Sequence, residues 1–112
     1  MKMSEHIYLF TITDRFHIEG RGPVVVPGIP WTYEGPVVRQ GDALILRTPL
    51  GGIIRTSLEA IEMVNYKPGG RRIEASAVLL AKGLHKFDIP IGTEVYLDSA
   101  ASSQGAGGGS SG

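Results

Sequence analysis

The side chains of this sequence that could do chemistry are a few charged and aromatic residues set among glycines and prolines. Arg21 lies between Gly20 and Gly22, where its guanidinium could donate two parallel hydrogen bonds to a phosphate. Alternatively, Arg21 pairs with Asp14 or Glu19 and holds the turn. The sequence leaves both roles open.

Two aromatic residues, Trp31 and Tyr33, fall in a loop bounded by Pro30 and Pro36. Exposed aromatic rings stack on nucleic-acid bases or anchor a protein partner. The alternative is that the loop folds over one end of the molecule and buries Trp31.

Glu62 could contact a ribose or a base, or it could be an exposed carboxylate beside Arg55 or Arg72. Arg71 and Arg72 form a small basic patch, although such a pair is by default a solvated turn. The tentative binding residues are therefore Asp14, Arg21, Trp31, Tyr33, Glu62, Arg71 and Arg72.

Catalytic and metal chemistry find no support in the sequence. The chain has 3 histidines, His6, His17 and His85, without ligand spacing, and it has no cysteine. Its serines and threonines lack a nucleophile elbow or a paired base. We expect no enzyme activity, no metal and no cofactor.

Charge and hydropathy also limit the function. Eleven basic and eleven acidic residues give a net charge of zero, which disfavours nucleic-acid binding through a strong overall field. No apolar run is long enough to span a membrane, and the start of the chain lacks a signal peptide. We therefore expect a cytoplasmic protein with no membrane partner. The 112 residues suit a single domain, predicted over 1–98, followed by a disordered Gly/Ser/Ala tail or linker over 99–112.

The elements that must position these residues read as short strands between glycine and proline turns. Strands are predicted over 6–13, 24–26, 43–48, 73–81 and 93–97, with 16–18 extending the first. In the first strand we expect Ile7, Leu9 and Thr11 on one side, and Tyr8, Phe10 and Ile12 on the other. We expect Pro27 at a bulge or a sheet edge. The pattern is typical of a small all-β barrel.

The segment 53–66 is ambiguous. Ser57 to Met63 would pass as a helix, with Ser57 as its cap. As a strand it needs a phase shift near Ala60, because Leu58 and Ile61 do not keep one parity. We favour a bulged strand, since every neighbouring element is β.

Three ordered segments resemble domain 2 of the translational GTPases of the elongation factor Tu type. They are Thr11 to Val25, with its Asp14, Phe16 and Gly-Arg-Gly; Gln40-Gly41-Asp42, followed later by Ile61-Glu62-Met63; and Ala77 to Leu80 with Asp88 to Val95. Together they cover about residues 8–98. The sequence departs from the family pattern at Thr13, Pro23 and Pro27.

The resemblance implies a small closed six-stranded antiparallel β-barrel without nucleotide chemistry of its own. The family's GTP site belongs to another domain, and this chain has no phosphate-binding loop motif, so no GTP binding is expected. By motif position, the family's tRNA-facing residues would fall on Asp14, Arg21 and Glu62. We therefore expect a non-catalytic binding module that contacts RNA, tRNA or the ribosome. The alternative is a protein-interaction or self-assembly module, partnered by another protein or a second copy, with no nucleic-acid role.

Overall fold

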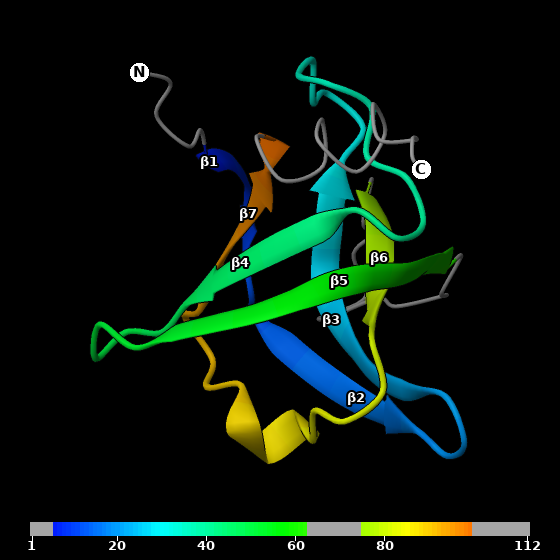
Figure 1. Ribbon diagram of the computed structural model, residues 1–112, viewed down its shortest axis with the longest axis vertical. Coiled ribbons are helices and arrows are strands. Elements are labelled where there is room, and N and C mark those ends of the chain that lie inside the picture. Colours follow the sequence, from blue (N-terminus) through cyan, green and yellow to red (C-terminus); the bar gives the residue numbers. More distant parts are fainter. Residues whose placement is uncertain (1–5, 63–74, 100–112) are drawn as a thin grey trace, which may run out of the picture.

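The computed structural model describes residues 6–62 and 75–99 of the chain. Within these ranges, seven strands form one antiparallel sheet in the order β1-β7-β4-β5-β6-β3-β2 (Figure 1). The prediction of an all-β chain is therefore confirmed. The elements are β1 (His6–Thr11), β2 (Asp14–Ile18), β3 (Gly22–Pro30), β4 (Ala43–Arg47), β5 (Ile53–Glu62), β6 (Ala75–Leu80), the 3-10 helix η2 (Lys86–Asp88) and β7 (Glu94–Asp98).

The sheet is not the closed six-stranded barrel that we expected. Closure requires a lateral ladder between the two edge strands. Here the edges are β1 and β2, which follow one another along the chain and are joined by Ile12 and Thr13. The Ile12 N–H donates to the Thr93 carbonyl at 2.8 Å, whereas the Thr13 N–H donates to the Val26 carbonyl at 2.8 Å. The chain bends between these two attachments, and among the described residues no ladder pairs β1 with β2.

The sheet curls around one main core. The core draws on β1, β3, β4, β5, β6 and β7, so it lies on the inner side of the curl (Figure 1). Its fully buried members include Ile12, Val25, Leu44, Leu46, Leu58, Val78, Leu80, Ile89, Val95 and Leu97. A second buried cluster of Val24, Val26, Ala77 and Leu79 alternates with core residues along β3 and β6. It therefore lies on the opposite face of those two strands.

Register shifts decide which side chains enter the core. The prediction of a bulged strand over 53–66 is confirmed as far as β5 is described, because its register shifts between Leu58 and Ala60. The predicted alternation in β1 is wrong. A shift between Tyr8 and Phe10 leaves Phe10 buried and Tyr8 50% exposed. A bulge changes the face on which the following residues project, which a strict period of two cannot express.

The middle of β3 is irregular, as expected from Pro27. Its register against β6 shifts between Val25 and Ile29, and the Val26–Pro27 peptide bond is cis. The predicted tail lies outside the described residues except for Ser99. No helix in 6–62 or 75–99 is long and apolar enough to cross a membrane.

Candidate functional site

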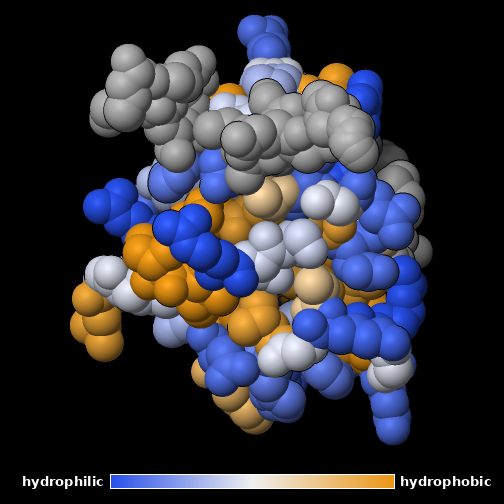
Figure 2. All heavy atoms as spheres, viewed as in Figure 1, coloured by the Kyte–Doolittle hydropathy of each residue, from blue (hydrophilic) through white to orange (hydrophobic). Residues whose placement is uncertain are grey.

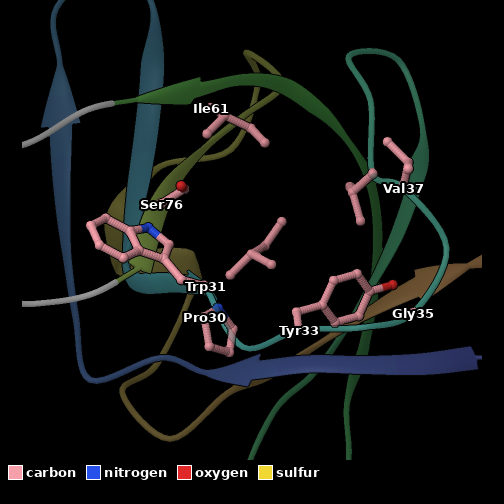
Figure 3. A pocket seen from close by; sticks show the side chains of 9 residues that line it. Pro30, Trp31, Tyr33, Gly35, Val37, Ile61 and Ser76 are labelled. Carbon is pink, nitrogen blue, oxygen red and sulfur yellow. The ribbon is translucent and has the colours of Figure 1, made fainter.

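A groove at one end of the molecule gathers the aromatic loop and the end of β5. It has a volume of about 260 Å³. Figure 3 shows the side chains of Trp31, Tyr33, Val37 and Ile61 arranged around the hollow. We call this the aromatic groove; its lining residues are Ile29, Pro30, Trp31, Tyr33, Gly35, Val37, Val38, Ile61 and Ser76.

The loop that forms one wall of the groove is held by its own hydrogen bonds. The Tyr33 N–H donates to the Pro30 carbonyl at 3.0 Å, and the Tyr33 hydroxyl donates to the Pro36 carbonyl at 2.7 Å. A Cβ on Gly35 would collide with the Tyr33 ring, so this position suits glycine. Tyr33 also packs against the main core, and burial raises its pKa. Tyr33 therefore ties the loop to the fold.

The groove exposes large apolar side chains. Trp31 is 56% exposed, Val37 68% and Ile61 42%. The alternative in which the loop buries Trp31 is therefore wrong. Single exposed apolar residues are common on protein surfaces, but several around one hollow are typical of interaction sites. Trp31 and Tyr33, singled out from the sequence, thus lie in the same site.

The sequence did not indicate the groove's other wall. Ile61 was assigned to a bulged strand without a face, and Val37 follows Pro36 outside any predicted strand. The pairing of Ile29 with Ser76 and of Ile61 with Val78 brings β3, β6 and β5 together here. Such pairings join residues far apart in the chain, so the only local signal was an apolar pair, Val37 and Val38, in a loop.

Glu62 follows Ile61 at the end of β5, opposite Ala77, so its backbone adjoins the aromatic groove. Asp14 begins β2 opposite Val26. Arg71 and Arg72 lie outside the described residues.

Arg21 lies in a second hollow, at the tip of the β2–β3 hairpin. This basic hollow has a volume of about 240 Å³ and is lined by His17, Gly20, Arg21, Gly22, Lys82, Gly83 and Leu84. The Arg21 N–H donates to the Ile18 carbonyl at 2.9 Å and closes the turn. The rings of His17 and His85 stack nearby, with centroids 5.2 Å apart. Lys82, for which the sequence carries no local signal, thereby lines the same hollow as Arg21.

The hairpin register separates Asp14 from Arg21. Asp14 is opposite Val26, whereas Ile18 is opposite Gly22, next to Arg21. Four residues of strand span about 13 Å at roughly 3.3 Å per residue. The two side chains therefore start from opposite ends of the hairpin and belong to different parts of the surface.

Among the described residues that line them, the groove and the hollow hold no arrangement typical of catalysis. Within 6–62 and 75–99, no group of three or more His, Cys, Asp or Glu side chains could hold a metal ion. The groove lining is aliphatic and aromatic apart from one serine.

Comparison of the chain with models of protein families gives no match, and neither does comparison with curated proteins.

Proposed function

We propose that this protein is a non-catalytic binding module whose aromatic groove holds a short apolar segment of a protein partner. The observation that carries the proposal is the meeting of three exposed apolar side chains, Trp31, Val37 and Ile61, around one hollow. Burying a fully exposed side chain of this kind contributes about 1.5–3 kcal/mol, and each of these three would gain the part that corresponds to its exposed surface. Binding would therefore remove unfavourable solvent contact from all three.

The lack of charged residues in the described lining of the groove supports an apolar ligand. None of its nine lining residues is charged. Among the described residues that line the groove, a nucleic-acid backbone would find no cation to offset its phosphates. Two or three apolar side chains of a peptide would instead replace water over the whole lining. The groove thus favours the protein-interaction alternative over an RNA contact.

The test uses the single tryptophan as its probe. Peptides selected from a random display library on the whole protein should shift the Trp31 emission when they bind, because Trp31 lines the groove. Val37→Asp should weaken the selected peptides about 10-fold or more, since it introduces a charge into an apolar contact. Leu50→Asp is the matched control, because Leu50 is 99% exposed and does not line the groove.

Equal loss of peptide binding in both variants, or peptides that bind without changing the Trp31 emission, would count against the groove. A selection that yields no binding peptide at all would reject the proposed function.

We propose RNA or ribosome contact through the basic hollow as the second candidate. His17, Arg21 and Lys82 line one cavity, and Arg21 occupies the Gly-Arg-Gly position of the resemblance to translation factor domain 2. Arg21→Ala should weaken tRNA binding and lower its salt dependence. Arg39→Ala, which changes an exposed arginine outside this hollow, should leave both unchanged. Salt-insensitive binding would contradict this candidate.

A further inference from the structure

The outer face of β1, β7, β4 and β5 carries a row of side chains that neither binding site uses. Tyr8 is opposite Tyr96 in the β1–β7 ladder. Tyr96 is opposite Ile45, and Ile45 is opposite Arg55. Residues directly opposite one another in an antiparallel ladder project from the same face. These four side chains therefore form one row across four strands.

A second row lies two residues along the strands. Glu94 is opposite Arg47, and Arg47 is opposite Ile53. A hollow of about 470 Å³ opens on this face, lined by His6, Ile45, Arg47, Gly51, Ile53 and Tyr96. Figure 2 shows apolar side chains gathered over β4 and the β4–β5 hairpin, with hydrophilic side chains lying across them.

The aromatic rings on this face form one cluster. The rings of Tyr8 and Tyr96 meet edge to face, with centroids 5.7 Å apart, and the His6 ring lies 6.4 Å from Tyr96. The Tyr8 hydroxyl is hydrogen bonded to the Thr11 hydroxyl at 2.6 Å. This bond fixes one edge of the Tyr8 ring, while half of the side chain remains exposed. Tyr8 is thus an ordered ring with surface left to stack on.

The charges on the two rows favour an anion. Arg47 and Arg55 are both exposed, whereas the acidic residues of this face are the half-buried Glu94 and the buried Asp98, so the arginines are the charges that a ligand would meet first. Glu94 accepts a hydrogen bond from the Tyr96 hydroxyl at 2.8 Å, so its carboxylate is already engaged. Asp98, the next outward residue of β7, is only 6% exposed, so its carboxylate offers little surface to a ligand.

We propose that this face binds single-stranded nucleic acid, with unpaired bases stacking on Tyr8 and Tyr96 and phosphates contacting Arg47 and Arg55. Aromatic rings on a surface that also carries cations are the combination that such strands bind, since every base offers a π-face. A duplex keeps its bases stacked on one another and cannot use the rings. The site shares no residue with the aromatic groove or the basic hollow.

The test measures fluorescence anisotropy of labelled 12-nucleotide oligo-U and oligo-dT, and of a duplex of equal length, with the whole protein. Both single strands should bind at low salt, and the duplex should bind at least about 10-fold more weakly. Tyr8→Ala should weaken single-strand binding about 10-fold, whereas Tyr8→Phe keeps the ring and should retain it. Arg55→Ala should weaken binding more than Arg55→Lys, which keeps the charge.

Arg21→Ala separates this proposal from the second candidate, because Arg21 lies in the basic hollow and should not alter oligonucleotide affinity. A loss with Arg21→Ala equal to that with Tyr8→Ala would overturn the assignment to this face. So would absence of single-strand binding at low salt, equal affinity for the duplex, or unchanged affinity in Tyr8→Ala. An unchanged Trp31 emission spectrum shows that each variant is folded. Should the face serve a protein instead, the oligonucleotides would fail to bind and the proposal would fall.

Discussion

Among single residues, Tyr96 has the clearest electrostatic setting. Its pKa is raised, first by the hydrogen bond to the Glu94 carboxylate and then by burial, while Arg47 acts in the opposite direction. A carboxylate beside the hydroxyl disfavours the phenolate, which would face a like charge. Because the folded pKa lies above the unfolded value, the stabilisation linked to Tyr96 is fully present below about pH 10 and is lost as the pH rises through the folded pKa.

We therefore expect Glu94→Gln to lower the Tyr96 pKa toward its ordinary value. Ultraviolet absorbance of the phenolate during an alkaline titration measures this, and Tyr96→Phe identifies which transition belongs to Tyr96. Tyr33 is an internal control, since its pKa is raised by burial and not by Glu94. An unmoved Tyr96 transition in Glu94→Gln would show that the carboxylate is not the main cause.

Position 28 requires glycine for two reasons, its backbone conformation and the close approach of a neighbouring strand. Its φ is +99°, and a Cβ there would collide with the Ser76 backbone oxygen. We expect Gly28→Ala to lower the free energy of unfolding by about 2–4 kcal/mol, measured by chemical denaturation. Gly51→Ala has a similar φ of +93° but open space around it, so it should cost only about 1–2 kcal/mol. Equal losses would mean that backbone strain alone explains Gly28.

The role of a single residue could be predicted from the sequence where that role depends only on its neighbours along the chain. A turn at Arg21 could be predicted from the glycines on either side of it, because a turn is encoded by adjacent residues, and both Gly20 and Gly22 have positive φ. Trp31 was recognised as a candidate, but its exposure was left open. Ile61 and Lys82 were missed as site residues, because their neighbours in space come from distant parts of the chain.

At the scale of elements, β5 contributes side chains both to the core and to the surface. Its first half pairs with β4 and its second half with β6, and the shift after Leu58 allows the strand to turn from one to the other. The sequence revealed this shift because the apolar parity changes near Ala60. The shift in β1 was not revealed, since Leu9 and Phe10 are adjacent apolar residues that fit either face.

Leu58 and Ile53, two side chains of equal size on β5, test how differently its core and surface positions contribute to stability. Leu58 is 1% exposed and Ile53 is 54% exposed. Leu58→Ala should cost about 2–5 kcal/mol of unfolding free energy, because it leaves a cavity in the core. Ile53→Ala should cost less than about 1 kcal/mol, as expected of a surface site. Thermal or denaturant unfolding compares them, and similar losses would show that Ile53 packs far more than its exposure indicates.

For the whole molecule, the curl of the sheet determines where the proposed binding surfaces lie. The closed barrel was expected from the pattern of short strands and glycine turns and from the resemblance to translation factor domain 2. Such a pattern predicts the strands, but it does not show whether the two edge strands pair with each other. Here β1 and β2 are one run of chain divided at a bend, so the sheet wraps around its core and keeps its two edges. The wrapping leaves the aromatic groove, the basic hollow and the outer face of β1, β7, β4 and β5 as separate sites.

These sites should differ in their response to salt, although the chain as a whole has no net charge. Peptide binding in the aromatic groove should change less than about twofold between 50 and 500 mM salt, because none of the described lining residues is charged. Single-strand binding on the outer face should weaken about 25-fold over the same range if Arg47 and Arg55 each neutralise one phosphate, at a slope of roughly −0.7 per contact. Titrations of each ligand in a salt series measure both slopes. Because screening acts on charged contacts and leaves apolar burial almost unchanged, a steep slope for the peptide or a flat slope for the oligonucleotide would reverse the roles assigned to the two surfaces.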